Sequence, residues 1–219
     1  MPSNKTMPLV VLISGSGSNL QSIIEACASG QIKAHIAAVI SNKADAYGLE
    51  RAQQAGITTA VLDHKQFPDR DSFDSELQKI IDTYQPGLVV LAGFMRILTP
   101  GFVNHYLGRM LNIHPSLLPN LQGLHTHQRA LEGGHTQHGA SVHFVTPTLD
   151  GGPVANRAVV DIKPDDDSKR LAARVLQEEH RIFPETIDWF VNNRLRLGGD
   201  QAILDDKPVP QLSANTDEQ

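Results

Sequence analysis

Short apolar runs alternate with helical patterns along the first half of the chain, and this alternation constrains the fold more than any other feature. The run Leu9–Ile13 is continuous and rich in β-branched residues, which is typical of a strand covered on both faces. Leu20, Ile23, Ile24 and Cys27 then recur at helical spacing. Repetition of this unit predicts an α/β fold with a doubly wound, mostly parallel sheet and helices on both faces, in a single domain.

The other expected elements extend the same rhythm. Further strands are predicted at 35–40, 58–62, 88–92 and 110–113, with helices at 47–55 and before Pro86. In the second half, the alternating segments at 138–145 and 154–161 predict a pair of strands in a mixed region of the sheet. A long helix is expected over 168–193, and Pro184 is expected to kink or break it.

Composition excludes several classes of protein. The chain has 219 residues with 19 basic and 24 acidic side chains, so its net charge of −5 argues against a nucleic-acid partner. Its single cysteine can form neither an internal disulfide nor a cysteine zinc site. No apolar run approaches the roughly 20 residues of a membrane span, and no signal peptide is recognisable. We therefore expect a cytoplasmic protein without membrane contact.

A glycine-serine loop, Ser14–Asn19, separates the first strand from the first helix. Glycines allow backbone N–H groups to approach an anion at a helix N-terminus, so the loop favours a site for a single phosphate. Leu20 occupies the place of the third glycine of a dinucleotide fingerprint, and no Gly-Lys-Ser/Thr follows for a Walker A motif. The alternative is a flexible turn with ordinary helix capping.

Asn112 and His114 lie two residues apart at the end of a predicted strand, so their side chains point the same way. An amide donor beside an imidazole suits an oxyanion or a proton transfer, whereas the alternative is a buried structural histidine. Asp150 precedes two glycines in a turn. It is either a turn former or a carboxylate near His114 that favours the protonated ring and fixes its orientation.

Histidines are concentrated in the middle of the chain, where six of the ten fall between positions 114 and 143. Their spacing lacks the helical pattern of common zinc sites, and no metal is expected. We expect His125 and His127 to shape a loop and His135 and His138 to lie at the surface.

Six motifs occur in a characteristic order: Ile13–Leu20, Ser41–Ala46, Leu91–Leu98, Leu111–Pro119, Gly123–His127 and Leu149–Pro153. Together they resemble the folate-dependent phosphoribosylglycinamide formyltransferases of purine biosynthesis. The resemblance implies the formyltransferase fold and transfer of a formyl group from 10-formyltetrahydrofolate, as co-substrate, to the amine of 5'-phosphoribosylglycinamide without a metal. It also implies that Asn112, His114 and Asp150 are catalytic.

The resemblance further implies two sets of ligand-binding residues. The ribonucleotide would be bound by Gly17, Ser18, Asn19, Leu176, Gln177, Glu178 and Glu179. The folate would be bound by Arg70, Met95, Arg96, Ile97, Leu98, Asn112, Thr146, Pro147, Thr148, Leu149 and Asp150. The chain departs from the family pattern at Ser16, where Asn is frequent, and at Asn120-Leu121-Gln122, which replaces a lysine, an aromatic residue and a proline.

Domain boundaries and alternative functions complete the expectations. We expect a flexible N-terminus at 1–7, a formyltransferase domain at 8–197 and an extension at 198–219 with a mobile end, in a monomer or homodimer that acts on small molecules. The alternatives are a formyltetrahydrofolate deformylase, which would need an additional N-terminal domain, and a tRNA formyltransferase, which would need a C-terminal domain and a more basic surface. A dehydrogenase or a nucleotide-binding module without catalysis is a third possibility.

Overall fold

A computed structural model describes residues 6–213. The chain divides into two compact units, Met1–Leu111 and Asn112–Gln219. The expected flexible segment 1–7 lies outside the described residues except for Thr6 and Met7, and the end of the expected C-terminal extension lies outside them from residue 214.

The first unit contains a parallel sheet in the order β3-β2-β1-β4. Its strands are β1 (Met7–Ile13), β2 (Ala34–Ser41), β3 (Thr59–Val61) and β4 (Leu88–Leu91). Residues 9–13 of β1 and the whole of β4 are buried, which explains why these segments are uninterrupted apolar runs. The expected strands in this half are therefore confirmed.

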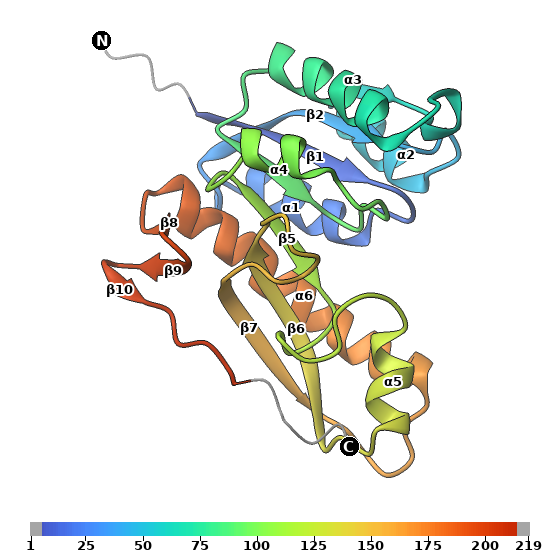
Figure 1. Ribbon diagram of the computed structural model, residues 1–219, viewed down its shortest axis with the longest axis vertical. Coiled ribbons are helices and arrows are strands. Elements are labelled where there is room, and N and C mark those ends of the chain that lie inside the picture. Colours follow the sequence, from blue (N-terminus) through green and yellow to red (C-terminus); the bar gives the residue numbers. More distant parts are fainter. Residues whose placement is uncertain (1–5, 214–219) are drawn as a thin grey trace. The chain divides into compact units, whose positions relative to one another are not determined.

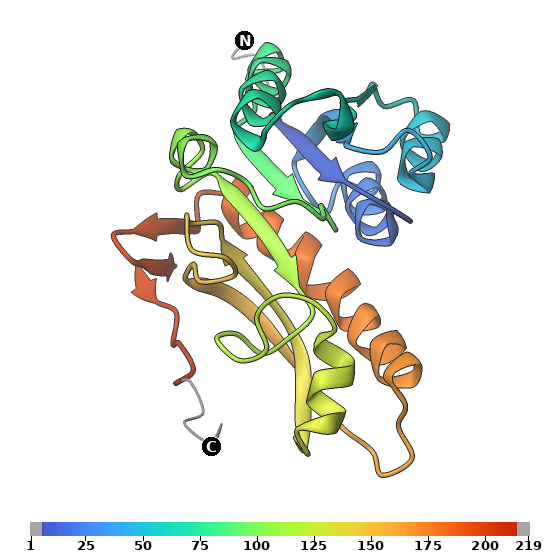
Figure 2. The same cartoon turned by 45° about the vertical axis from the view of Figure 1, so that its right-hand side comes forward.

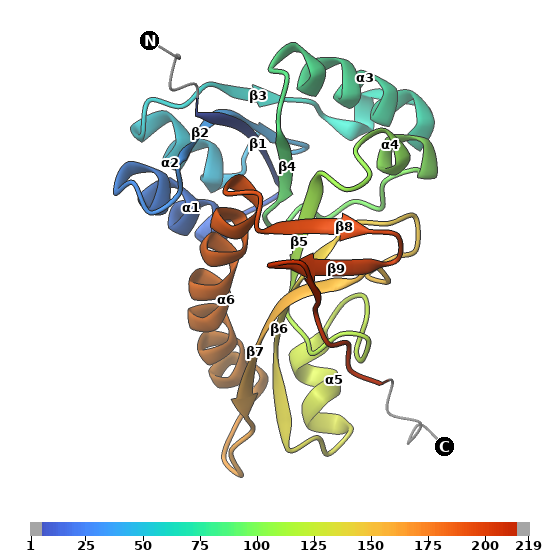
Figure 3. The same cartoon turned by 90° about the vertical axis from the view of Figure 1, so that its left-hand side faces the viewer.

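Helices cover both faces of this sheet, as Figure 3 shows. On one side lie α1 (Ser18–Ala28) and α2 (Tyr47–Gln54), and on the other lie α3 (Arg70–Thr83) and α4 (Pro100–His105). A short 3₁₀ helix, η1 (His64–Gln66), precedes α3. Side-chain caps fix two of these helix starts, because Asp69 accepts from the Ser72 N–H and Thr99 from the Phe102 N–H.

The second unit is organised around a hairpin. β6 (Gln137–Phe144) and β7 (Val154–Asp161) pair antiparallel, with β5 (Met110–His114) on the other side of β6. The long helix α6 (Ser168–Val191) lies along β6 and β7 (Figure 1). The shorter helix α5 (Thr126–Glu132) precedes β6, beside the far end of the hairpin (Figure 2).

The long helix of the second unit differs from the expectation. α6 continues through Pro184 from Ser168 to Val191, so the predicted break is wrong. Proline lacks an N–H and disturbs only the local helix ladder, while the apolar face around it, including Ile182, Phe183 and Ile187, is buried and holds the helix together.

After α6 the chain forms a small antiparallel sheet of its own. Its strands are β8 (Leu195–Gly198), β9 (Gln201–Leu204) and β10 (Lys207–Pro208), in the order β10-β9-β8. The α/β class, with mostly parallel strands and helices on both faces, is confirmed. Within residues 6–213, no helix combines the length and the apolar character needed to span a membrane.

Candidate active site

Two polar side chains lie at the end of β5, as the alternation along the strand predicts. Asn112 and His114 flank Ile113, and Pro115 follows where the strand ends. His114 is buried, so any charge on its imidazole is shielded from water. The strand therefore presents an amide and an imidazole together at a protected position.

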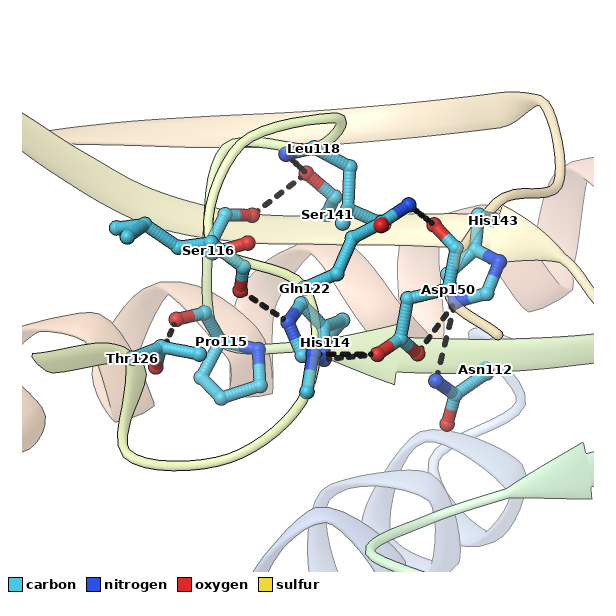
Figure 4. A network of polar contacts seen from close by, with 12 residues as sticks. Asn112, His114, Pro115, Ser116, Leu118, Gln122, Thr126, Ser141, His143 and Asp150 are labelled. Carbon is cyan, nitrogen blue, oxygen red and sulfur yellow. Dashed lines mark hydrogen bonds and ion pairs between the residues drawn. The ribbon is translucent and has the colours of Figure 1, made fainter. Parts of the chain in front are cut away.

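The Asp150 carboxylate reaches this pair from the turn before β7 (Figure 4). Its Oδ2 lies 3.5 Å from His114 Nδ1 and accepts a 3.0 Å hydrogen bond from the Gly123 N–H. Asp150 has a φ of 47°, in the left-handed region that Asp and Asn tolerate best among residues with a Cβ. Asp150 thus lies in the turn, and its carboxylate faces the imidazole.

The other nitrogen of His114 is also engaged. Nε2 lies 3.0 Å from the carbonyl oxygen of Leu121, which can only accept, so this nitrogen carries a proton. Nδ1 therefore faces the Asp150 carboxylate while Nε2 is fixed by the loop after β5. A hydrogen bond from this ring to a substrate requires that one of these two contacts gives way.

His143 is a site residue that the sequence reasoning missed. Its buried ring donates from Nδ1 to the Phe144 carbonyl at 3.0 Å, so the neutral ring keeps its lone pair on Nε2. That nitrogen lies 3.1 Å from Asn112 Nδ2, which donates to it, and 3.8 Å from Asp150 Oδ1. Burial lowers the pKa of His143 to about 4, so the ring is a neutral acceptor that orients the Asn112 amide.

A signal for His143 existed in the sequence. It lies next to last in a strand segment shortly before the Asp150 turn, between Val142 and Phe144, and polar residues at buried positions need partners. Which partner it finds depends on the pairing of β5 with β6, which no local pattern specifies.

The loop after β5 is held by hydrogen bonds rather than by apolar packing alone. Ser141 Oγ donates to the Ser116 carbonyl at 2.7 Å and accepts from the Leu118 N–H at 3.1 Å, as Figure 4 shows. Thr126 Oγ1 donates to the Pro115 carbonyl at 2.7 Å. Gln122, which departs from the family pattern, donates from Nε2 to the Asp150 carbonyl at 3.2 Å. The unusual segment is therefore tied directly to the Asp150 turn.

The glycine-serine loop of the first unit is shaped by a close backbone approach. Gly17 has a φ of +69°, and a Cβ there would lie 2.5 Å from the Cα of Gly48. The Gly48 N–H donates to the Gly15 carbonyl at 3.0 Å, and Arg51 Nε donates to the Ser16 carbonyl at 2.9 Å. Ser18 is the first residue of α1, so the loop opens directly onto the N-terminus of that helix.

Ser14 links this loop to another predicted segment. Its hydroxyl donates to Asn42 Oδ1 at 2.6 Å and accepts from the Met95 N–H at 2.8 Å. Three of the motifs noted in the sequence therefore meet within the first unit. Asn19 itself is buried in the first turn of α1.

The predicted folate residues of the first unit are Arg70, on α3, and the segment Met95–Leu98, which contacts Ser14 through the Met95 N–H. Met95 and Ile97 are 61% and 55% exposed, a large fraction for apolar side chains, whereas Leu98 is buried. The Arg96 guanidinium lies over the Phe73 ring, 4.7 Å from its centroid. Arg70 is exposed at the start of α3.

The remaining predicted residues belong to the second unit. Thr146, Pro147, Thr148 and Leu149 lead into Asp150, and Leu149 is 50% exposed. Leu176, Gln177, Glu178 and Glu179 lie on α6, where Glu179 is buried and Glu178 pairs with Arg181 at 2.7 Å. Of the predicted set, the structure brings Asn112, His114 and Asp150 into one cluster with His143.

The expectation for the other histidines is partly wrong. His138 is buried in β6 rather than exposed, because its ring packs edge-on against His127 with Nε2 3.1 Å from His127 Nδ1. Burial lowers the pKa of His138 to about 4 and also lowers the pKa of His127. Among residues 6–213, no group of three or more His, Cys, Asp or Glu side chains is arranged to hold a metal ion.

Comparison with known proteins shows the family. A formyl transferase family model matches residues 7–187 and so spans parts of both units. The chain is 55% identical to the phosphoribosylglycinamide formyltransferase of Escherichia coli over 97% of its own length and 100% of the relative. It is 49% identical to the Haemophilus influenzae enzyme of the same name over 93% and 96% of the two chains.

Solved structures give the same result. A phosphoribosylglycinamide formyltransferase structure from Coxiella burnetii superposes with a TM-score of 0.90 at 54% identity, covering 94% of this chain and 97% of the other. A glycinamide ribonucleotide transformylase from Symbiobacterium toebii gives a TM-score of 0.88 at 43% identity, covering 91% and 94%. The chain therefore belongs to the formyl transferase family.

Proposed function

We propose that the cluster of Asn112, His114 and Asp150 carries formyl transfer in this enzyme. The chain is a phosphoribosylglycinamide formyltransferase, which transfers a formyl group from 10-formyltetrahydrofolate to the amine of 5'-phosphoribosylglycinamide in purine biosynthesis. The observation that best supports the residue roles is the 3.5 Å approach of the Asp150 carboxylate to His114 Nδ1, with Asn112 on the same strand.

The chemistry needs a stabilised oxyanion. The substrate amine forms a bond to the formyl carbon, and the carbonyl oxygen becomes negative in a tetrahedral intermediate. Asn112 and protonated His114 supply hydrogen bonds to that oxygen, and donors of this kind contribute roughly 3–4 kcal/mol each to lowering the barrier. The intermediate collapses when the bond from carbon to the folate nitrogen breaks, and a proton passes from the attacking amine to that nitrogen.

The geometry supports a specific proposed task for each group. Asn112 Nδ2 has two hydrogens, of which one is donated to His143, so the other is available for the oxyanion. The 3.5 Å contact between Asp150 and His114 is longer than a good hydrogen bond, so we expect it to give way when the imidazole donates to a substrate oxygen. Asp150 then holds positive charge on the imidazole and helps to move the proton from the amine.

We expect backbone N–H groups to bind the phosphate and side chains to bind the other parts of the two substrates. We propose that the ribonucleotide phosphate binds at Gly17–Asn19, where N–H groups at the start of α1 attract an anion. The residues 176–179 of α6 would contact the rest of the ribonucleotide, with Glu179 as partner of the ribose or the amine. Folate would bind along Arg70, Met95–Leu98 and Thr146–Asp150, where exposed apolar side chains can cover a flat ring.

A spectrophotometric assay tests the function. Wild-type protein should convert a formyl-folate donor only when phosphoribosylglycinamide is present, whereas a deformylase would consume the donor without the amine.

Adding phosphate or a nucleoside monophosphate should slow hydrogen exchange at Gly17–Asn19. Unchanged exchange at saturation would remove the phosphate site from the proposal.

The proposal also covers partners and location. The substrates are small molecules. We infer that the enzyme works in the cytoplasm without nucleic acid, which its net charge of −5 supports, and as a monomer or homodimer. Light scattering coupled to gel filtration measures the oligomeric state, and added RNA or DNA should leave both elution and activity unchanged.

A further inference from the structure

The residues Val209–Ser213, here called the C-terminal strap, run along the open edge of β7 and lie beyond the part of the chain that matches the family model. Gln211 makes the main contact. Its Oε1 accepts from the Val154 N–H at 3.0 Å, and its Nε2 donates to the Val154 carbonyl at 3.0 Å and to the Val209 carbonyl at 2.8 Å. One side-chain amide therefore satisfies both backbone groups of Val154.

This contact takes the place of a neighbouring strand. β7 is the last strand in its sheet, so on its outer side the backbone groups need another partner. Val154 pairs with His143 on its inner side and follows the Asp150 turn by four residues. The Phe144 N–H donates to the Pro153 carbonyl at 3.1 Å and closes the base of that turn. Gln211 thus holds Val154, the first residue of β7, in place directly after the Asp150 turn.

Two further hydrogen bonds hold the strap in place. Arg157 Nη1 donates to the Pro210 carbonyl at 3.1 Å, and the Val209 N–H donates to the Ala202 carbonyl in β9 at 2.8 Å. The Arg157 side chain is itself enclosed, with its Nε and Nη2 shielded from solvent. The strap is therefore bound to β7 and to the small C-terminal sheet at successive residues.

The far end of the strap approaches the other partner of His114. Leu212 and Ser213 line a cavity of about 220 Å³ together with Leu117, Asn120 and Leu121. The Leu121 carbonyl is the group that accepts from His114 Nε2. One short segment thus touches the base of the Asp150 turn and borders the loop that carries Leu121.

We propose that the C-terminal strap positions the Asp150 carboxylate against His114, and that Gln211 is its principal positioning residue. This inference rests on the proposed function, because it concerns the same imidazole and carboxylate. Without the amide of Gln211, the start of β7 loses its outer hydrogen bonds and the Asp150 turn gains freedom. A displacement of about 1 Å in a catalytic group can slow a reaction on the order of 100-fold.

The test compares Gln211→Met with Gln128→Met. Methionine keeps the length of glutamine but can neither donate nor accept as the amide does. Gln128 is an exposed glutamine of α5 that bonds only within its helix, to Glu132 at 2.7 Å, so it controls for the substitution itself. We expect Gln211→Met to lower kcat about tenfold or more, with little change in the KM for phosphoribosylglycinamide, and Gln128→Met to match wild type.

Two NMR measurements separate positioning from a loss of folded protein. In Gln211→Met the Val154 amide should exchange faster while the amides of β6 away from this end stay protected. The ¹⁵N shifts of His114 should move, because its carboxylate partner is displaced. A fall in kcat with unchanged His114 shifts would overturn the proposal, and so would wild-type kcat in Gln211→Met.

The same measurements work independently of the proposed reaction. If wild-type protein transferred no formyl group, the proposed function would fail, while the exchange of Val154 and the shifts of His114 would still report on the strap. If Gln211→Met did not fold, Gln211→Asn, which is one methylene too short for both bonds to Val154, replaces it. Protection of Val154 in wild type no greater than that of an exposed amide also contradicts the proposal.

Discussion

The glycine-serine loop and the Asp150 turn are both candidate binding segments, but the first presents backbone groups and the second presents side chains. The loop depends on backbone, since Gly17 lies against Gly48 and the carbonyls of Gly15 and Ser16 are held by Gly48 and Arg51. The Asp150 turn depends on side chains, since its carboxylate faces His114 and His143. A backbone site is encoded by adjacent residues, whereas a side-chain site needs residues that are distant along the chain.

This difference predicts different sensitivities. A backbone site tolerates changes of side chain, such as Ser16 in place of the family's frequent Asn, provided that the φ angles are preserved. A side-chain cluster tolerates little, because each polar atom is the partner of another. Substitutions at Asp150 and Gly17 therefore test the comparison directly.

The largest effect is expected at the carboxylate. Asp150→Asn preserves the size of the side chain and tolerates the φ of 47°, so the turn should keep its shape. Loss of the negative charge beside His114 removes the group that we propose stabilises the imidazole during transfer, and kcat should fall about 10²- to 10⁴-fold. His114→Ala should lose a similar amount. Steady-state kinetics measure both, and near-wild-type kcat in either variant would remove that residue from its role.

The buried histidines of the second unit should make the free energy of unfolding fall in acid. His138 has a pKa of about 4 in the folded protein because of burial, against 6.5 when exposed, so the unfolded chain binds the proton more tightly. The contribution of neutral His138 to the free energy of unfolding is therefore present above pH 6.5 and is lost as the pH drops toward 4. The loss from this residue amounts to about 2 kcal/mol between pH 7.5 and pH 5.

Urea unfolding at pH 7.5 and pH 5 measures this loss. His143, whose pKa is also about 4 through burial, adds a contribution of the same sign. His138→Gln removes one titrating ring and should flatten the dependence on pH. An unfolding free energy that is equal at the two pH values would show that these rings are not held neutral.

Gly17→Ala tests the backbone site. The new Cβ meets Gly48 and the φ of +69° disfavours any side chain, so the unfolding free energy should fall by about 1–3 kcal/mol. The KM for phosphoribosylglycinamide should rise while kcat at saturation is largely retained, because the proposed catalytic side chains are unchanged. Gly15→Ala is the matched control, since its Cβ meets nothing within 4 Å. Equal effects of the two substitutions would contradict the proposed importance of the Gly17–Gly48 approach.

The sequence predicted much of the fold because its apolar runs are long and buried on both faces, as in β1 and β4. It also predicted the shared direction of Asn112 and His114, which follows from strand alternation alone. It could not place Asp150 beside His114, since the 35 residues 115–149 of loop, helix and strand separate them and only the β6–β7 pairing brings the turn back. The resemblance to a family supplied that step.

Other details depended on tertiary contacts with no local signal. The burial of His138 depends on His127 packing against it from α5, which spacing does not reveal. The role of His143 depends on β5 and β6 being neighbours in the sheet. The persistence of α6 through Pro184 reflects burial of its apolar face rather than helix propensity.

The smallest effect is expected at Gln122, which tests how far the side-chain site extends. Gln122→Ala removes the 3.2 Å hydrogen bond from Nε2 to the Asp150 carbonyl but leaves the Gly123 N–H bonded to the carboxylate. One exposed hydrogen bond contributes about 0.5–1.5 kcal/mol, so kcat should fall no more than about tenfold. Arg129 still donates to the Gln122 carbonyl at 2.6 Å, so the loop keeps its other anchor. If Gln122→Ala lowers kcat as far as Asp150→Asn does, the orientation of the turn matters as much as its charge, and the boundary of the side-chain site lies at this loop rather than at Asp150.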